Sequence, residues 1–382
     1  MTASNDHPPA PEFGAPTKTV QRDLGNARAI VHDWLLPRLP GAKNLVLSDI
    51  EMPSGAGVAN ETLMFDATWT DDAGPREQSF VLRVDSPDPL FLDSPAEVHY
   101  RVYKVLGEES FVPVPPVLGF ESDTSLLGSP FFLMAKIEGR VPGDQPPFNV
   151  EGWVVDLAPA DRHKLWANFV AAMAQLHQVD HRKFDFLQRP HLGSSGLEQE
   201  VRHWFRYYQL NRGDKHYPVV EAAEQWLIDN LPANAPTGFS WGDSRLQNVI
   251  YQGTDVAAVL DWDMVSLAGG ESDVAWYCVL QHGQTLGMGL PALEGIGTRR
   301  QTLDLWEQHV GRKAENFEYH LMFAAYRLAT VMIRLPNLLR ASGLEAAADY
   351  LADTQTGIPY LAQMLDIPYE KSADYPWTGL DG

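Results

Sequence analysis

The spacing of apolar residues changes near Gly139, and this change constrains the fold more than any other feature of the chain. Before Gly139, apolar side chains come in short runs separated by turn residues, which is typical of strands in an antiparallel sheet. After it, they recur about every 3.6 residues, as they do in amphipathic helices. The pattern therefore predicts an α+β fold with two lobes, of which the second is larger and mostly helical.

The N-terminal lobe is expected at residues 17–137, after a proline-rich flexible tail at residues 1–16. One helix is expected at 95–106, where apolar residues have helical spacing and Gly107 follows. The expected strands of its single antiparallel sheet are 45–50, 61–69, 79–84, 116–120 and 131–137.

The C-terminal lobe is expected at residues 138–382, and one non-helical segment, 239–263, interrupts it. Within that segment, 248–251 and 256–260 predict two short strands around a tight turn. The expected helices are 165–176, 201–210, 219–230, 272–280, 299–310, 317–339 and 344–365.

Composition excludes several classes of protein. The 382 residues include 29 basic and 50 acidic side chains, a net charge of −21, which repels nucleic acids and anionic membrane surfaces. The single cysteine, Cys278, excludes a disulfide scaffold. The longest uncharged stretch, 274–293, contains glutamine, histidine, glycine and proline, unlike a membrane-spanning helix. With no export signal apparent, these features predict a cytoplasmic location.

Three polar side chains stand among the strand-like apolar residues of 239–263: Asp243, Asn248 and Asp261. Burying carboxylates there costs several kcal/mol unless a cation, hydrogen bonds or a reaction compensates. Mg²⁺ takes oxygen ligands, usually one or two carboxylates together with nucleotide phosphates. The interval from Asp243 to Asn248, with Asp261 ending the next apolar run, matches the loop spacing of protein kinases. The alternative is that Asp243 and Asn248 only cap turns.

The segment 239–276 contains W-G-D-S-R-L-Q-N-V, A-V-L-D-W-D-M and E-S-D-V-A-W. It resembles the signature of the aminoglycoside phosphotransferase family of kinase-like enzymes, and most of all its bacterial and acyl-CoA-dehydrogenase-associated members. The resemblance covers roughly 48–350. It implies a protein-kinase-like two-lobed fold and ATP- and Mg²⁺-dependent phosphorylation of a hydroxyl group on a small molecule.

The resemblance also implies roles for individual residues. Asp243 corresponds to the catalytic base, and Asn248 and Asp261 to the magnesium ligands. Asp273 corresponds to a carboxylate that braces the catalytic loop. His177 and Asp180 match a pattern at a helix end, where we expect capping and packing roles.

The nucleotide is expected in the N-terminal lobe. Gly55, Gly57 and Asn60 lie between two expected strands, where small residues let backbone N–H groups approach phosphates, although an ordinary hairpin turn explains the glycines equally well. A P-loop motif is absent from the sequence. The resemblance implies that strand 131–137 leads into the hinge between the lobes, where the backbone around Lys136 would pair with adenine. ATP is the expected donor and GTP the alternative.

The chain departs from the family pattern at three positions. Arg83 stands where kinase-like folds have a lysine, and it would hold the α and β phosphates. Kinase-like folds pair this basic residue with a glutamate on the N-lobe helix. At that helix the aligned turn offers Glu97, His99 or neither. Trp241 replaces a histidine, so any structural hydrogen bond from that ring must be made by the indole N–H or is lost.

Arg83 and the missing partner glutamate motivate a second hypothesis, a catalytically weak nucleotide-binding regulatory protein. The intact Asp243, Asn248 and Asp261 argue against it. A metal-dependent hydrolase finds little support, because the sequence contains no H-E-x-x-H.

The acceptor is open at this point, and the sequence does not indicate an oligomeric state. The aromatic segment 203–208 could line a site for an apolar alcohol, but it is also typical of a packed amphipathic helix. The carboxylates that could suit a cationic aminoglycoside are Glu138, Asp144, Glu198 and Glu200.

Overall fold

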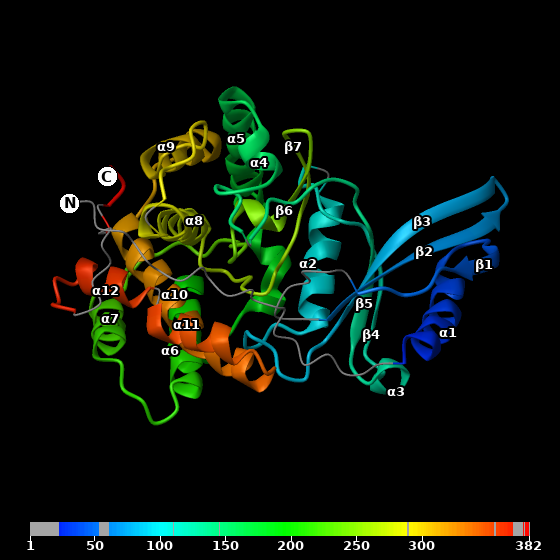
Figure 1. Ribbon diagram of the computed structural model, residues 1–382, viewed down its shortest axis with the longest axis horizontal. Helices are drawn as coiled ribbons and strands as arrows, with labels where there is room; N and C mark the ends of the chain where they lie inside the picture. The colour runs from blue at the N-terminus through cyan, green and yellow to red at the C-terminus, as the bar shows by residue number, and fades with distance from the viewer. Residues whose placement is uncertain are drawn as a thin grey trace.

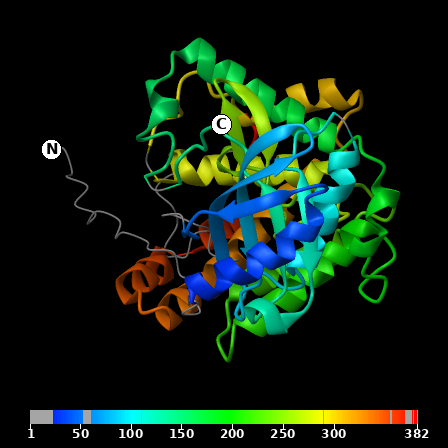
Figure 2. The same ribbon diagram turned by 90° about the vertical axis from the view of Figure 1, so that its right-hand side faces the viewer.

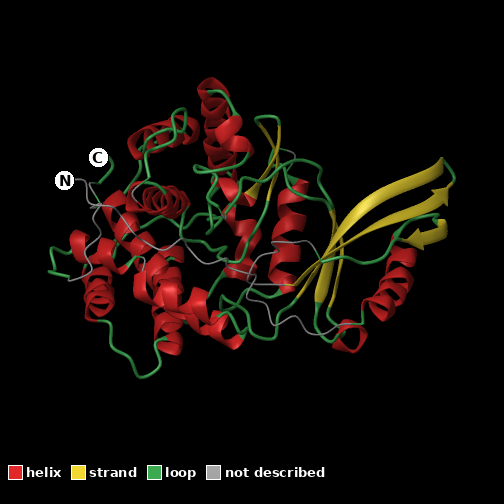
Figure 3. Ribbon diagram, in the orientation of Figure 1, coloured by secondary structure: helices red, strands yellow, loops and turns green. Residues whose placement is uncertain are grey.

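The computed structural model describes residues 23–52, 61–109, 111–144, 146–288, 290–354, 357–369, 377 and 379–381. A twisted sheet with adjoining helices forms one end of the molecule, and helices dominate the other (Figures 1 and 3). The predicted α+β architecture with a β-rich N-terminal lobe is therefore confirmed. The expected tail at 1–16 lies outside the described residues.

The sheet of the N-terminal lobe has the strand order β1-β2-β3-β5-β4, and every neighbouring pair is antiparallel. Its long β2–β3 hairpin keeps one register from the pair Glu61 and Val84 to the pair Asp71 and Gly74. The five strands overlap the five predicted ones: β1 (Lys43–Leu47), β2 (Glu61–Asp71), β3 (Gly74–Val84), β4 (Val117–Glu121) and β5 (Phe131–Ala135).

One face of the sheet is covered by α1 (Leu24–Leu35), a helix that the sequence did not predict (Figure 2). Asp23 caps it, because its carboxylate accepts the backbone N–H groups of Gly25 and Asn26. Its buried face packs against alternate residues of the central strands. This core includes Ala27, Val31, Trp34, Leu35, Leu63, Phe65, Leu82 and Leu133.

The opposite face of the sheet points toward α2 (Ala96–Glu108) and the C-terminal lobe. Side chains alternate along β3, so Val81 and Arg83 lie on this face while Leu82 packs against α1. The carboxylate of Asp85 accepts the backbone N–H of Ala96 at 2.6 Å and so fixes the start of α2 at the end of β3. This arrangement presents Arg83 toward the junction of the two lobes.

The C-terminal lobe packs several of its helices around the long buried α10 (Phe317–Ala341), and α8 (Gly270–Gln284) makes the most extensive contact with it. Its two-stranded hairpin consists of β6 (Val249–Gln252) and β7 (Asp255–Val259), within one residue of the prediction.

The short helical turns of the two lobes are η1 (Leu36–Arg38), α3 (Thr124–Leu127), α4 (Trp153–Asp156), η2 (His181–Leu187), η3 (Leu246–Asn248) and η4 (Leu286–Met288). The longer helices are α5 (Pro159–Leu176), α6 (Gly196–Asn211), α7 (Pro218–Asp229), α8 (Gly270–Gln284), α9 (Arg299–Val310), α10 (Phe317–Ala341), α11 (Glu345–Thr354) and α12 (Ile358–Met364).

The single helix expected at 344–365 is two helices, α11 and α12, so that expectation was wrong. Gly357 precedes α12 with a φ of 97°, which side-chain-bearing residues rarely adopt. A Cβ atom on Gly357 would lie 2.6 Å from the backbone nitrogen of Ala329 in α10. The glycine therefore allows the chain to turn in close contact with α10. Among the described helices, none is both long and apolar enough to cross a membrane.

His320, buried in α10, predicts acid sensitivity of the fold. Burial lowers the pKa of His320 to about 4, and its Nδ1 lies 2.9 Å from the Ser272 hydroxyl. An unfolded chain has an ordinary histidine pKa near 6.5, so between about pH 6.5 and pH 4 only the unfolded state binds this proton. Stability should therefore fall as the pH drops through this window, by about 1 kcal/mol per pH unit from this group.

Urea unfolding midpoints at pH 7, 6 and 5 measure this effect. The variant His320→Asn, which cannot be protonated, should lose less stability over the same window than the wild type. Equal losses in the two proteins would show that other groups cause the acid sensitivity.

Candidate active site

Asp243 lies in the loop that precedes η3 and β6, and three side chains orient its carboxylate. One oxygen accepts the indole N–H of Trp276 at 2.8 Å. The other accepts the Nε–H of Arg245 at 3.0 Å and the amide of Asn248 at 2.8 Å. The Asp243 side chain is 14% exposed, so the carboxylate is both held and accessible.

Gly242 allows this loop to lie against the chain that follows the hairpin. Its φ is 94°, and a Cβ atom would lie 2.0 Å from the carbonyl oxygen of Met264. Any side chain here would force the two segments apart. Glycine is therefore required beside Asp243, both for its positive φ and for the close contact between its backbone and that of Met264.

Asp273, in the first turn of α8, braces the loop as the family resemblance implied. Its fully buried carboxylate accepts the Ser240 hydroxyl at 2.9 Å and the backbone N–H groups of Trp241 and Gly242, both at 2.7 Å. His177 Nε2 lies 2.7 Å from the same carboxylate. A carboxylate with this many donors is well compensated for its burial.

His177 does more than the expected capping and packing. Trp306 donates its indole N–H to His177 Nδ1 at 2.8 Å, so Nδ1 is the acceptor and Nε2 carries the proton directed at Asp273. The ring therefore supports the catalytic loop through Asp273. Asp180 has the expected capping role, because it accepts the backbone N–H of Arg182 at the start of η2.

Asn248 and Asp261 lie at the same end of the β6–β7 hairpin, since the backbone N–H of Leu260 donates to the carbonyl of Asn248 at 2.9 Å. The amide nitrogen of Asn248 binds Asp243, which leaves its amide oxygen as the atom for a cation. Asp261 has a φ of 65°, an uncommon conformation for a residue other than glycine.

Electrostatics at Asp261 favour a cation. Burial and the neighbouring carboxylates of Asp263 and Asp243 raise the pKa of Asp261 well above its ordinary range, against the opposing charges of Arg83 and Arg245. A divalent cation would offset this repulsion. The two oxygen donors of Asn248 and Asp261 therefore fit Mg²⁺ held jointly with nucleotide phosphates.

Trp241, fully buried, makes the hydrogen bonds expected of its position. Its indole N–H is 2.8 Å from the carbonyl oxygens of both Leu260 and Asp261. The ring thus connects the catalytic loop directly to the turn that carries Asp261.

Arg83 donates to the Thr62 hydroxyl at 2.8 Å, across the β2–β3 hairpin. Its positive charge also acts on the pKa of Asp261 and Asp263, so it faces the C-terminal lobe. Among the described residues, neither candidate partner on α2 pairs with Arg83: Glu97 is exposed, and His99 is buried against Asp263.

Lys136 donates its backbone N–H to the carbonyl of Ser79 at 2.9 Å, and its side chain pairs with Glu138 at 3.2 Å. That backbone donor is therefore used within the sheet, and adenine pairing at the hinge stays a prediction. The expected phosphate-binding residues Gly55, Gly57 and Asn60 lie outside the described residues.

The four carboxylates considered for a cationic acceptor lie in different settings. Asp144 reaches the catalytic loop, where it accepts from Arg245 at 2.7 Å. Glu138 pairs with Lys136, Glu198 accepts from Ser194 near the start of α6, and Glu200 is buried against Arg189. They do not form one acidic patch. The aromatic segment 203–208 belongs to α6, where Trp204, Tyr207 and Tyr208 are packed in the core.

Sequence reasoning missed Arg327, a buried cation beneath the catalytic loop. Its guanidinium lies 4.6 Å from the ring centre of Trp276 and donates to the carbonyls of Gly242 at 3.4 Å and Ser272 at 3.2 Å. The sequence does mark this residue, because Arg327 is the single charged side chain in the apolar stretch 321–333 and arginines are rarely buried without a partner.

Residues 62–309, which are 248 of the 382, match the family model described as the phosphotransferase enzyme family, APH. Among curated proteins, acyl-CoA dehydrogenase family member 11 of Pongo abelii is 30% identical over 204 residues, which cover 52% of this chain and 25% of that protein. The probable acyl-CoA dehydrogenase IBR3 of Arabidopsis thaliana is 27% identical over 59% of this chain and 27% of its own length. The chain thus spans about a quarter of the length of these relatives.

Solved structures show the same two-lobed fold. A candidate aminoglycoside phosphotransferase of Ralstonia eutropha has a TM-score of 0.65 at 23% identity, covering 88% of this chain and 98% of its own. The GDP complex of aminoglycoside 2′-phosphotransferase-IIIa has a TM-score of 0.53 at 11% identity, covering 86% of this chain and 98% of its own. These similarities confirm the predicted kinase-like fold.

Proposed function

Because this chain belongs to the phosphotransferase enzyme family, we propose that it transfers a phosphoryl group from ATP to a hydroxyl of a small molecule, with Mg²⁺ as cofactor. GTP is the alternative donor. The observation that carries the proposal is the carboxylate of Asp243, oriented by three donors next to the oxygen donors Asn248 and Asp261. The proposal specifies a hydroxyl group as the acceptor and does not name the molecule that carries it.

In this mechanism Asp243 orients the acceptor hydroxyl and takes its proton as the bond to phosphorus forms. Trp276, Arg245 and Asn248 keep the carboxylate in one orientation, which favours a productive approach of the hydroxyl. Arg83 holds phosphate oxygens from the N-lobe side. Asn248 and Asp261 would hold Mg²⁺, which would supply positive charge to neutralise the phosphates.

Nucleotide binding by the variant Asp261→Ala tests the metal assignment. For the wild type, a non-hydrolysable ATP analogue with Mg²⁺ should raise the melting temperature, since a ligand at about 100 times its Kd stabilises a protein by about 2.7 kcal/mol. The alanine variant should lose the part of this shift that depends on Mg²⁺. Thermal-shift titrations with and without Mg²⁺ measure both quantities.

The matched control is Asp255→Ala, a 74% exposed aspartate at the other end of the same hairpin, which should behave as the wild type. No shift of the wild type with ATP or GTP would contradict the proposed function. Mg²⁺-dependent binding without phosphoryl transfer to any hydroxylated acceptor would instead support the catalytically weak regulatory protein.

A further inference from the structure

Three polar side chains, two of them buried and one partly buried, meet where α2 contacts the C-terminal lobe. Ser94 and His99 come from the N-terminal lobe, and Asp263 follows Asp261 by two residues. The Ser94 hydroxyl lies 2.8 Å from His99 Nε2 and donates to Asp263 Oδ1 at 3.0 Å. His99 Nε2 is itself 3.1 Å from Asp263 Oδ1. His99 is 2% and Asp263 7% exposed, so this contact between the lobes is shielded from water.

Proton counting fixes how the three groups interact. The single proton of the Ser94 hydroxyl goes to Asp263, so the hydroxyl accepts from His99 and Nε2 of that ring carries a proton. Asp263 Oδ1 therefore accepts the Ser94 hydroxyl proton, and it shares the Nε2 proton of His99 with the Ser94 oxygen.

Asp263 is directly linked to the proposed metal ligand. Its backbone N–H donates to Asp261 Oδ1 at 3.2 Å, within a turn where Asp261 has its unusual φ. A contact that fixes the position of Asp263 therefore also fixes the direction of the Asp261 carboxylate. The outer partners of a metal ligand commonly set its orientation in this way.

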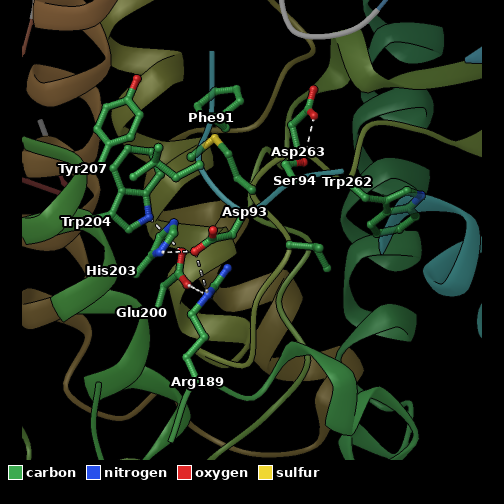
Figure 4. A pocket seen from close by; sticks show the side chains of 13 residues that line it. Phe91, Asp93, Ser94, Arg189, Glu200, His203, Trp204, Tyr207, Trp262 and Asp263 are labelled. Atoms are coloured by element: carbon green, nitrogen blue, oxygen red, sulfur yellow. Dashed lines mark hydrogen bonds and ion pairs between the residues drawn. The ribbon is translucent and has the colours of Figure 1, made fainter. Parts of the chain in front are cut away.

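Ser94 is in turn anchored through the residue before it. The Asp93 carboxylate lies 3.5 Å from Arg206, 3.6 Å from His203 Nδ1 and 3.9 Å from Arg189. Figure 4 shows Asp93 directed at Arg189 and His203 while Ser94 contacts Asp263. The short segment before α2 is thus attached to the C-terminal lobe at two successive residues.

We propose that Ser94 and His99 are positioning residues that couple helix α2 to the metal-binding turn, by holding Asp263 so that Asp261 is directed at Mg²⁺. This inference rests on the proposed function. It gives His99 and Ser94 the role of linking the N-lobe helix to the metal site. The sequence alone left Glu97, His99 or neither as the partner on that helix.

The test measures the affinity of a non-hydrolysable ATP analogue by calorimetry, with and without Mg²⁺, in variants of His99. His99→Leu removes the donor and should weaken the Mg²⁺-dependent affinity about tenfold, the lower end of the cost of losing an outer partner of a metal ligand, because His99 acts on Asp261 through Asp263. Its affinity without Mg²⁺ should match the wild type. His99→Gln can place an amide donor near the Nε2 position and should restore most of the loss.

The matched control is Glu97→Gln, an exposed position in the same helix, which should not change either affinity. If His99→Leu does not fold, Ser94→Ala replaces it and should show a smaller loss in the same direction. Unchanged Mg²⁺ dependence in His99→Leu or Ser94→Ala would overturn the coupling, as would an equal loss with and without Mg²⁺. A wild type that binds no nucleotide would instead overturn the proposed function.

Discussion

Asp243→Asn is expected to lower the rate of phosphoryl transfer by about 10² to 10⁴-fold, the range that a general base contributes. An asparagine has nearly the same shape but cannot take the acceptor's proton. Its amide nitrogen would also face the donors Arg245 and Asn248, which now bind a carboxylate oxygen. The affinity for the nucleotide should stay within about twofold, because Asp243 is not proposed to hold the phosphates or the metal.

Two measurements separate these effects: the transfer rate to a hydroxylated acceptor found by screening, and the Kd of a non-hydrolysable ATP analogue. Asp255→Asn makes the same chemical change on the exposed end of the hairpin and should keep full activity. A variant Asp243→Asn with near wild-type turnover would refute the assignment of Asp243 as the base. A large loss of nucleotide affinity would move its role from proton transfer to nucleotide binding.

Asp273→Ala is expected to destabilise the protein by about 3 to 5 kcal/mol, the cost of breaking a buried charged network on one side. The variant would leave the backbone N–H groups of Trp241 and Gly242 without their acceptor in a dry environment. His177 would lose the carboxylate that its Nε2–H binds. Asp273→Asn keeps the volume and one acceptor oxygen, so it should lose less.

Urea unfolding midpoints at constant pH measure both variants. Asp304→Ala, at an exposed position in α9, is the matched control and should stay within about 0.5 kcal/mol of the wild type. A loss below about 1 kcal/mol in Asp273→Ala would show that water replaces the carboxylate and that the loop is less dependent on Asp273 than its contacts indicate.

The parts of the fold that the sequence predicted are those set by local patterns. Short apolar runs separated by turn residues located the strands of the sheet and the β6–β7 hairpin, with every end within about five residues of the observed one. Helix α1 was missed because Gly25 and Asn26 are poor helix formers, and the cap at Asp23 and packing on the sheet stabilise it. The break at Gly357 was missed because its cause is the close approach of α10, far away in the sequence.

In the candidate site, too, the sequence predicted the residues set by local patterns and missed those set by long-range contacts. Asp243, Asn248 and Asp261 could be singled out because they lie within one short segment whose hairpin brings them together. Arg327 and Trp276 reach the loop from distant helices, so no local spacing indicates their contacts. The link from His99 to Asp263 joins positions 164 residues apart and depends on how the two lobes pack.

The indole of Trp241, which joins the catalytic loop to the carbonyls of Leu260 and Asp261, has a consequence for regulation by acidity. A histidine in this place would gain or lose a proton near pH 6.5 and could break or strengthen the link. An indole has no such equilibrium and is always a donor. The connection between the loop of Asp243 and the turn of Asp261 therefore does not depend on a titrating ring across the physiological range of pH.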